Sequence, residues 1–446
     1  MKLSFKEKIG YGVGDFACNL VFSTLMLYLM FFYTDVFGIP AAVVGTLMLV
    51  VSVWDAVSDP LMGGIADRTT TRWGKFRPYL LWLAVPFAVS TALAFTTPPF
   101  SVSGKIVYAY ITYFLLMTVF TAINVPYSAL SGVMTDDSIE RTGLNAYRMG
   151  FSQFGNLLVG AGTLPLVALL GSGDQALGYQ LTMVIFGIIA LVFFIVCFST
   201  TRERISPPEG QKTSLKADLQ MLMMNRPWQV IFIVGILSFI FIILRTSVVM
   251  YYFNYFVESQ RLIPFFMAST SISAIIGVTF SKPMVKKIGK KWTFALGQLV
   301  SAATVIFFFL PKTAIFSMFA VNVIYGMASF MTIPITWAMI ADTADYSEWK
   351  FKIRSTGIVF SAATFAHKLG IGIGGGLGGW LLFFFGYIPG VSQTNTAVVG
   401  IKSMMSIIPA IGAIIVACLI IFYKIDENMC NKIREDLAKQ RTAGKE

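Results

Sequence analysis

Residues 41–66 read AAVVGTLMLVVSVWDAVSDPLMGGIA, and this stretch indicates which class of fold the chain adopts. It carries no charge before Asp55, and it is longer than the roughly 20 apolar residues that a helix needs to cross a bilayer. Two carboxylates, Asp55 and Asp59, nevertheless stand inside it, one helical turn apart. Acids at this depth are costly, so they indicate an ion or solute pathway.

The composition of the whole chain extends this picture. Of its 446 residues, 56% are hydrophobic and 13% are charged, whereas about a quarter are charged in soluble domains. This composition excludes a disordered protein, a nucleic-acid-binding domain and an ordinary soluble enzyme. The net charge of +12 therefore does not indicate a nucleic-acid partner. The four cysteines form no CxxC pair and there is one histidine, so we expect neither a disulfide, a metal site nor a cofactor.

Apolar runs separated by short polar breaks predict an all-α integral membrane protein with twelve transmembrane helices. The predicted spans are 11–36, 41–66, 78–97, 106–134, 145–170, 178–200, 228–257, 263–287, 292–310, 314–341, 356–386 and 402–423.

Lysine and arginine are concentrated in the even-numbered loops and at both ends of the chain. The positive-inside rule therefore places these loops and both termini in the cytoplasm. The first residues lack the pattern of a cleavable signal peptide, so we expect none to be removed.

The chain is predicted to consist of two six-helix halves, 1–200 and 228–423, joined by a cytoplasmic linker at 201–227 and followed by a tail at 424–446. An internal sequence repeat supports the division into two halves, because TDDSIERTGL at 135–144 resembles DTADYSEWKFKIRSTGI at 342–358. Repeated halves are how transporters build a site that opens to either side.

The tail carries an apolar stripe of side chains spaced four apart. We interpret it as a packing helix, with a helix on the inner membrane surface as the alternative. The stripe consists of Ile425, Met429, Ile433 and Leu437.

Asp55 and Asp59 are close enough that both cannot stay ionised in a low dielectric without a cation. We therefore predict that they hold H+ or Na+, with neutral oxygens from Ser58 and Thr121. The alternative is a hydrogen-bonded pair between helices. Lys368, inside the eleventh span, is the expected counter-charge.

Further polar side chains stand in predicted spans. Arg148 and Arg245 are expected to pair with an acid or with a carboxylate on a substrate, and Asp15 to cap or pair near the inner surface. His367 is expected to be packed and neutral. Some neutral side chains suit a sugar pocket, and for each the alternative is a hydrogen bond that only holds two helices together. They are Asn19, Asn124, Tyr127, Trp337 and Thr364.

Three motifs together resemble the glycoside–pentoside–hexuronide:cation symporter family, the melibiose-permease branch of the major facilitator superfamily. They are WDAVSDPLMGGIADRTTTRWGKFRP at 54–78, NVPYSAL at 124–130 and ADTADYSEW at 341–349. The similarity begins at KEKIGYGVGD, residues 6–15, and reaches the twelfth span. It implies two six-helix bundles of the major facilitator fold, alternating access, and uptake of a sugar with H+, Na+ or Li+.

The resemblance also implies roles for single residues. Asp55 and Asp59 match the cation-binding acids, Arg148 and Lys368 match cations of the pocket, and Thr364 lies one turn before the lysine. The inner gate of charge pairs is matched by Arg141, Asp342 and Asp345.

Three positions depart from the melibiose-permease pattern. Asn19 and Asn124 stand where that branch has acids, and Cys18 stands where it has a lysine. The departures point away from melibiose and from Na+, and they favour H+.

We therefore expect a non-enzymatic symporter of the bacterial inner membrane, with a small sugar and membrane lipid as partners. A lysolipid transporter of the same fold is the first rival, and a lateral opening lined by apolar residues would distinguish it. A membrane-embedded enzyme is disfavoured because no His–Asp or serine-based motif is present. The sequence determines neither the sugar nor the oligomeric state.

Overall fold

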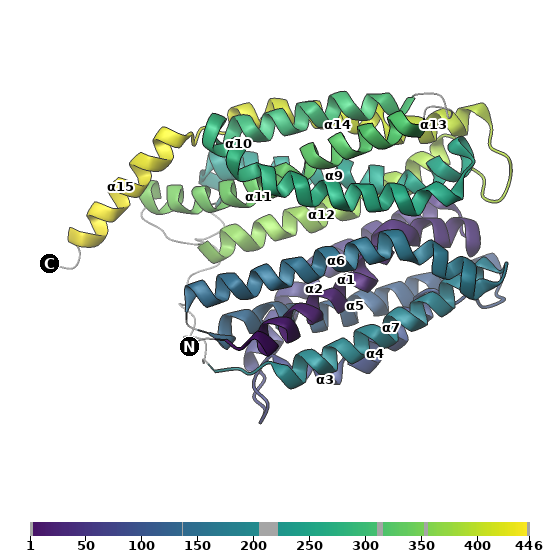
Figure 1. Cartoon of the computed structure of the whole chain (residues 1–446), viewed down its shortest axis with the longest axis horizontal. Helices are drawn as coiled ribbons and strands as arrows, with labels where there is room; N and C mark the ends of the chain where they lie inside the picture. Colours follow the sequence, from purple (N-terminus) through teal and green to yellow (C-terminus); the bar gives the residue numbers. More distant parts are fainter. Residues whose placement is uncertain (1–2, 136, 205–221, 310–314, 352–355, 444–446) are drawn as a thin grey trace. The chain divides into compact units, whose positions relative to one another are not determined.

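A computed structural model describes residues 3–135, 137–204, 222–309, 315–351 and 356–443. These residues are helical apart from short connections (Figure 1), and within them the only β-type pairing is an isolated bridge between Thr71 and Gly74. The all-α fold class predicted from the apolar runs is therefore confirmed.

The chain divides into two compact units, and neither is one uninterrupted stretch. Unit 1 comprises Met1–Gly210, Val249–Ser271 and Gly375–Val398, and unit 2 comprises Gln211–Val248, Ile272–Gly374 and Val399–Glu446. The predicted boundary at 201–227 lies mostly outside the described residues, so that boundary stays a prediction.

The first half of the chain forms the following elements: α1 (Phe5–Phe31), η1 (Phe32–Val36), α2 (Ala41–Arg68), α3 (Arg77–Trp82), α4 (Ala84–Ala94), α5 (Val102–Met134), α6 (Ser138–Gly171) and α7 (Gln175–Thr200). The second half forms α9 (Arg226–Tyr251), η2 (Tyr252–Val257), η3 (Gln260–Leu262), α10 (Ile263–Val305), η4 (Ile306–Phe309), α11 (Ile315–Phe351), α12 (Thr356–Phe384), α13 (Asn395–Met405), α14 (Ile407–Leu419), η5 (Ile420–Phe422) and α15 (Glu427–Ala443).

Ten helices of the described residues are long and apolar enough to cross a membrane. The difference from twelve has a local cause at two places. The eighth and ninth predicted spans run together as α10, which is interrupted at Gly289 with φ of 78°. The third predicted span is divided between α3 and α4 at Leu83, so neither piece is long enough.

Polar caps fix where several helices begin. Ser4 accepts the Glu7 amide while the Glu7 carboxylate accepts the Ser4 amide, and this reciprocal pair starts α1. Ser101 starts α5, and Asp174 starts α7 by accepting two backbone amides. These caps satisfy amides that the first turn of each helix would otherwise leave unbonded.

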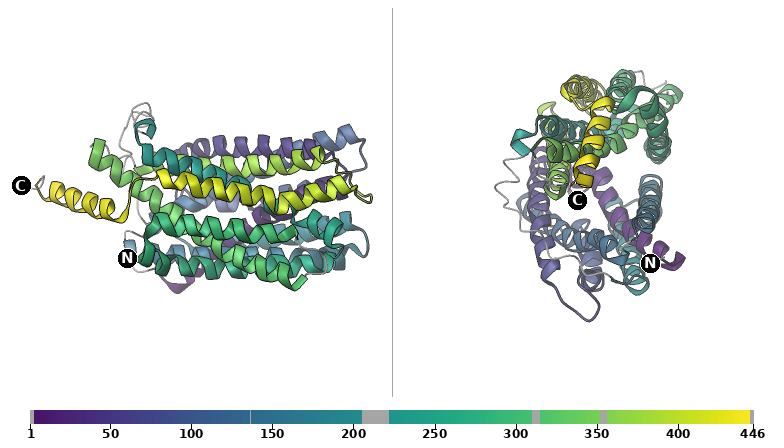
Figure 2. Two further views of the ribbon diagram at one scale, coloured as in Figure 1. Left: turned by 90° about the horizontal axis from the view of Figure 1, so that it is seen from above. Right: turned by 90° about the vertical axis from the view of Figure 1, so that its left-hand side faces the viewer.

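Helix α1 is the most enclosed helix of unit 1. It packs against α6 and α7, while α2 packs on α5 and α4 packs on α7. Figure 2 shows these helices, coloured purple to teal, from two further sides. Tyr11 and Tyr28 of α1 have no exposed surface. Side chains of α1 are therefore positioned to form a site in the interior of this unit.

Glycines let α2 and the end of α12 come into backbone contact within unit 1. A Cβ added at Gly379 would lie 2.3 Å from the Ala41 carbonyl oxygen, and one at Gly45 would lie 2.6 Å from that of Gly376. Any larger residue at these positions would separate the two helices.

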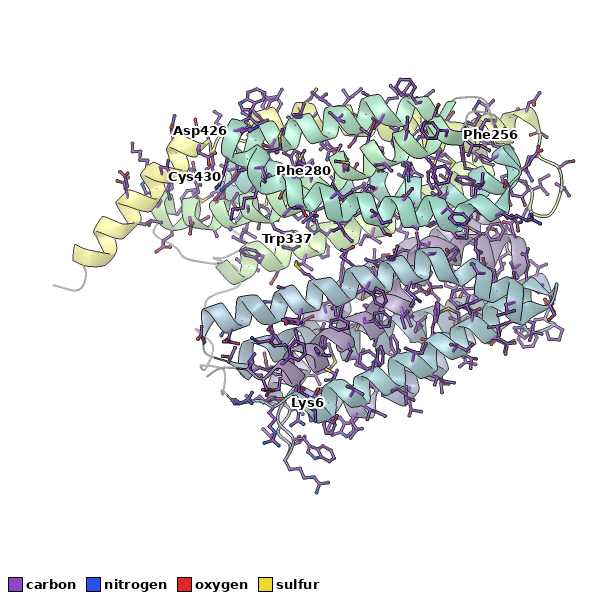
Figure 3. The ribbon with its side chains drawn as sticks, viewed as in Figure 1. Lys6, Phe256, Phe280, Trp337, Asp426 and Cys430 are labelled. Carbon is purple, nitrogen blue, oxygen red and sulfur yellow. The ribbon has the colours of Figure 1, made fainter. Side chains whose placement is uncertain are left out.

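Unit 2 has an apolar core and an apolar exterior. Trp228 and Met339 are buried in its core, whereas Phe280 on α10, labelled in Figure 3, is 51% exposed. Exposed aromatic side chains on long helices are expected where lipid is the solvent.

The apolar stripe of the tail forms one side of α15 and packs into this core. Ile425, Ile433 and Leu437 are all nearly buried. Trp349 of α11 donates its indole N–H to Asp436 at 2.9 Å. The interpretation of this segment as a packing helix is confirmed.

Candidate functional site

Asp55 of α2 is held in the interior of unit 1 by a hydroxyl from α5. Thr121 donates its hydroxyl hydrogen to Asp55 Oδ1 at 2.6 Å, and Ser58 lies 3.4 Å from Thr121 Oγ1 and 3.1 Å from the Asp55 backbone oxygen. Asp55 is 6% exposed and Thr121 is 2% exposed. Three of the four residues predicted to bind the cation therefore lie together.

Asp59 lies one turn further along α2 and is partly buried. Pro60 follows it inside the helix and lacks the N–H that would otherwise bond the Ala56 carbonyl. That carbonyl is a further oxygen close to the acids along the helix. Lys368 belongs to unit 2, so its pairing with these acids stays a prediction.

A second polar cluster joins α1 to α6 within unit 1. Arg148 Nε donates to Asp15 Oδ1 at 3.0 Å, and Asn19 donates its amide to the Asp15 backbone oxygen at 2.9 Å and to Oδ2 at 3.2 Å. Asp15 is buried, whereas 30% of the Arg148 side chain is exposed. Asp15 thus pairs with a base, one of its two expected roles, and fixes Arg148 beside Asn19.

Tyr127 of α5 packs against the Arg148 end of this cluster. The Arg148 guanidinium lies over its ring at 5.5 Å, and its hydroxyl donates to the Tyr11 carbonyl at 2.7 Å. Tyr127 has no exposed surface, because the ring also stacks on Tyr11 and fills the space left by Gly14. This geometry gives Tyr127 the role of a platform for Arg148.

The remaining predicted sugar ligands lie on α5, α11 and α12. Asn124 is partly buried one turn beyond Thr121, and Thr364 is exposed and donates to the Phe360 carbonyl at 3.1 Å. In unit 2, Trp337 contacts His367 edge to face at 4.9 Å. His367 is 8% exposed among aromatic rings, as its expected packed role requires.

Arg245 is enclosed in unit 2 and is 3% exposed. It donates to the Asn322 amide oxygen at 2.9 Å, and its guanidinium lies over the rings of Tyr325 at 4.0 Å and Phe308 at 4.9 Å. Asn322, Tyr325 and Phe308 hold the guanidinium of Arg245 in the core of unit 2, and its expected pairing with an acid or a substrate carboxylate stays a prediction.

The residues predicted for an inner gate are found in different units. Asp342 of unit 2 pairs with Lys290 at 2.5 Å, and Arg141 of unit 1 donates to the Thr135 carbonyl at 3.0 Å. Asp345 lies one turn from Asp342 on α11 and is partly buried. The gate between the halves stays a prediction.

Glu203 is a structural residue that the sequence analysis missed. Its carboxylate accepts the backbone amides of Lys75, Phe76 and Arg77 at 2.8, 2.8 and 2.9 Å, where α3 begins. A carboxylate at a helix start offsets the partial positive charge there. The available signal was an acid among basic residues, TRER at 201–204, on the same predicted side of the membrane as RWGKFRP at 72–78.

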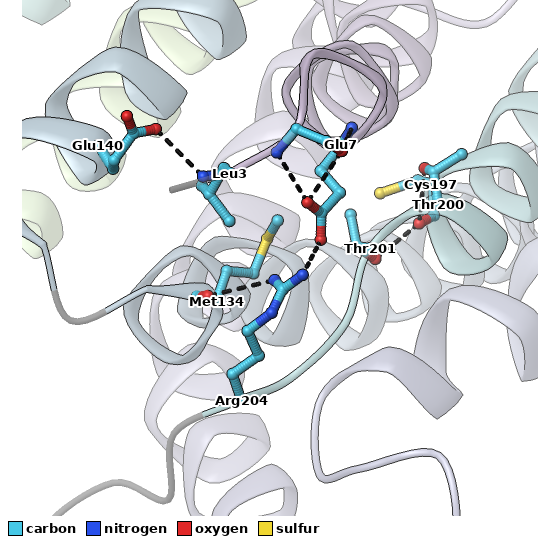
Figure 4. A network of polar contacts seen from close by, with 9 residues as sticks. Leu3, Glu7, Met134, Glu140, Cys197, Thr200, Thr201 and Arg204 are labelled. Carbon is cyan, nitrogen blue, oxygen red and sulfur yellow. Dashed lines mark hydrogen bonds and ion pairs between the residues drawn. The ribbon is translucent and has the colours of Figure 1, made fainter. Parts of the chain in front are cut away.

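The start of α1 is tied to its unit by two further ion pairs. Arg204 pairs with Glu7 at 2.5 Å, and Lys8 pairs with Glu140 at 2.8 Å. Figure 4 shows Glu7 bonded to Arg204, and Glu140 bonded to the Leu3 amide. These contacts fix the end of α1 opposite η1.

Comparisons with known proteins agree on the class. Residues 10–427 match the family described as MFS/sugar transport protein. The chain is 38% identical to the inner membrane symporter YicJ of Escherichia coli over 98% of this chain and 95% of that protein. It is 35% identical to an isoprimeverose transporter of Lactiplantibacillus pentosus over 95% of this chain and 89% of that one.

Solved structures resemble the chain in fold. A peptide transporter of the POT type, crystallised with alafosfalin, superposes with a TM-score of 0.68 at 12% identity, covering 97% of each chain. Identity this low shows the fold alone.

Proposed function

Because the chain belongs to the MFS/sugar transport protein family, we propose that it is a symporter that imports a sugar together with a cation by alternating access. The substrate class is a glycoside, pentoside or hexuronide, and the ion is H+ in preference to Na+. The observation that carries the proposal is the buried Asp55 carboxylate of α2, held by the Thr121 hydroxyl of α5.

The ion is assigned to Asp55 and Asp59. Burial penalises two ionised carboxylates one turn apart, so binding of a positive ion stabilises them. Thr121 already donates its single hydroxyl hydrogen to Asp55, and this bond orients the carboxylate toward its helix neighbours. Neutral Asn19 and Asn124 add no further charge for a metal cation, which favours a proton.

The sugar is assigned to the cluster of Arg148 and Asn19. Asp15 engages the guanidinium through Nε, so the terminal nitrogens carry N–H groups that suit sugar hydroxyls. The Asn19 amide donates both of its hydrogens to Asp15, so its carbonyl oxygen is the group that suits a sugar hydroxyl. An aromatic ring is the other usual partner of a sugar, and Trp337 is the candidate.

The cycle then follows from charge. Without the ion, the buried acids resist the change of access, and with ion and sugar bound the buried charge falls. One elementary charge moving across 100 mV supplies about 2.3 kcal/mol. At about 1.4 kcal/mol per tenfold, this sustains a sugar gradient of roughly fiftyfold.

The membrane is the bacterial inner membrane, with both termini in the cytoplasm. The named inner membrane symporter supports the compartment. The basic residues of the loops before α3 and around Gly289 support the orientation, because such loops stay on the cytoplasmic side.

A lysolipid transporter is the second candidate, and one observation favours it. Unit 1 contains a cavity of about 580 Å³ whose walls are mostly apolar, including Phe31, Leu164 and Phe265. Asp174 and Arg261 also line it, and these opposite charges suit the two charges of a zwitterionic headgroup.

Counterflow in proteoliposomes separates the two candidates. Labelled glycosides, pentosides, uronides and a lysophospholipid are each offered at several pH values, with and without Na+. We expect exchange of one sugar class and stimulation by a proton gradient. Exchange of the lysophospholipid without any sugar would overturn the proposal, and uptake that requires Na+ at every pH would overturn the choice of ion.

A further inference from the structure

Asp35 gathers hydroxyl groups from three segments that are far apart in the chain. Tyr255 of η2 and Tyr387, which follows α12, both donate to Asp35 Oδ1, and Thr34 donates to Oδ2 at 2.6 Å. The Tyr387 and Tyr255 hydroxyls also lie 3.1 Å apart. All these residues belong to unit 1, so one carboxylate ties the ends of α1, α9 and α12 together.

A fourth hydroxyl extends the cluster. Thr34 and Tyr251 are 2.7 Å apart, and a hydroxyl has only one hydrogen. The Thr34 hydrogen has Asp35 Oδ2 at 2.6 Å and the Met30 carbonyl at 3.0 Å as acceptors, and whichever it takes, Tyr251 donates to Thr34. The ring of Tyr251 meets Tyr387 edge to face at 5.1 Å, and Tyr251 has no exposed surface.

The hydrogens point in one direction, toward the carboxylate. Hydrogen bonds to an ionised acceptor are about twice as strong as neutral ones. If the segments part, the carboxylate loses the two tyrosine donors together, so the cluster has two discrete states. Thr34 alone, its neighbour in sequence, would remain.

The backbone changes its geometry at the same place. Helix α1 ends in the π-helical turn Phe32–Val36, which carries Asp35, and α9 ends in the π-helical turn Tyr252–Val257, which carries Tyr255. Such turns inside helices are frequent at functional sites. Both lie at the helix ends opposite the basic loops, which the charge distribution places on the outer side.

We propose that Asp35, Thr34, Tyr251, Tyr255 and Tyr387 form a latch that keeps the outer side of the transport path closed. Asp35 acts here as a positioning residue, distinct from the ion and sugar residues. The inference rests on the proposed alternating access, and it is tested by a measurement that needs neither sugar nor ion.

The experiment measures access to a cysteine placed beneath the latch. Met30 is 3% exposed and lies one turn before Thr34, so Met30→Cys reports opening of the outer side. A membrane-impermeant maleimide is applied to right-side-out vesicles that contain the full chain. Labelling of the unsubstituted protein gives the background from its native cysteines. Tyr387→Phe and Tyr255→Phe are each compared with the Met30→Cys parent.

We expect labelling to rise about tenfold in each variant, which corresponds to about 1.4 kcal/mol. The matched control is Tyr108→Phe, which removes a hydroxyl bonded to the Leu93 carbonyl within the first half of the chain. Its labelling should equal that of the parent.

A double-mutant cycle separates a latch from general loosening. In an Asp35→Ala background, Tyr387→Phe should add less than twofold, because both changes remove the same bond. Unchanged labelling in both tyrosine variants, a rise in Tyr108→Phe as large as theirs, or full additivity would overturn the proposal. Melting temperatures of the purified variants show whether a rise in labelling reflects unfolding. A rise caused by unfolding would be additive in the double variant, and it would count against the latch.

Discussion

Glu203 occupies the space that a side chain at Gly74 would need. A Cβ at Gly74 would lie 2.4 Å from the Glu203 carboxyl carbon, and the glycine has φ of 109°. The carboxylate cannot swing away cheaply, since three backbone amides at the start of α3 bind it. One glycine and one acid, more than a hundred residues apart in the chain, therefore fix the loop before α3.

We predict that Gly74→Ala destabilises the protein by about 1–3 kcal/mol, because it adds backbone strain and displaces Glu203. Thermal unfolding in detergent measures the effect. Gly64→Ala is the matched control, since a Cβ at Gly64 meets nothing within 4 Å and alanine favours a helix. Equal melting temperatures for the two variants would show that the contact with Glu203 is unimportant.

Thr121→Val should shift the ion dependence of uptake by about tenfold, because the buried Asp55 carboxylate loses its hydroxyl donor and the valine keeps the shape. The lost bond favoured the ionised carboxylate, so a proton should be bound more tightly in the variant, whereas Na+ should be bound more weakly. The measurement is the ion concentration, or pH, that gives half-maximal sugar uptake. Thr118→Val on the same helix is the control, since that hydroxyl is bonded to Trp54 instead. A shift of the same size in both variants would argue against Thr121.

Asp15→Asn should raise the KM for sugar by about ten- to a hundredfold while leaving the ion dependence unchanged. The reason is that Arg148 loses the ionised partner that fixes its guanidinium. Asp55→Asn should do the reverse, abolishing accumulation against a gradient while exchange of sugar persists. If Asp15→Asn changed the ion dependence instead, the assignment of separate ion and sugar clusters would be wrong.

The sequence predicted the helical fold because long apolar runs have few other solutions in lipid. It also predicted that Asp55, Ser58 and Thr121 would meet, which α2 packing on α5 achieves. The helix count was harder, because Gly289 interrupts α10 without ending the helical pattern.

Other contacts could not be predicted, because they join segments with no shared periodicity. Glu203 binds a loop more than a hundred residues earlier, and Asp35 binds Tyr255 and Tyr387 at still greater separations. The burial of Tyr127 depends on Gly14, on another helix, and no pattern within α5 indicates it.

The ion pair at the start of α1 should respond to acid. Lys8 donates to the Glu140 carboxylate at 2.8 Å, and this hydrogen bond lowers the pKa of Glu140 below its usual value of 4.5. A lowered pKa means that the folded state favours the ionised form. The stabilisation is therefore fully present above pH 4.5 and is lost as the pH falls through the folded value.

Amide hydrogen exchange measures this loss directly. We expect exchange at the first turn of α1 to accelerate below pH 4.5, beyond the intrinsic change of rate with pH, and the acceleration to shrink in high salt because both partners of the ion pair are partly exposed. Glu140→Gln should already show the faster exchange at neutral pH and no further acceleration in acid. Glu140→Gln has no ionised partner for Lys8 at any pH, whereas the unsubstituted protein loses that partner only in acid. If both proteins responded to acid in the same way, the effect would belong to another group.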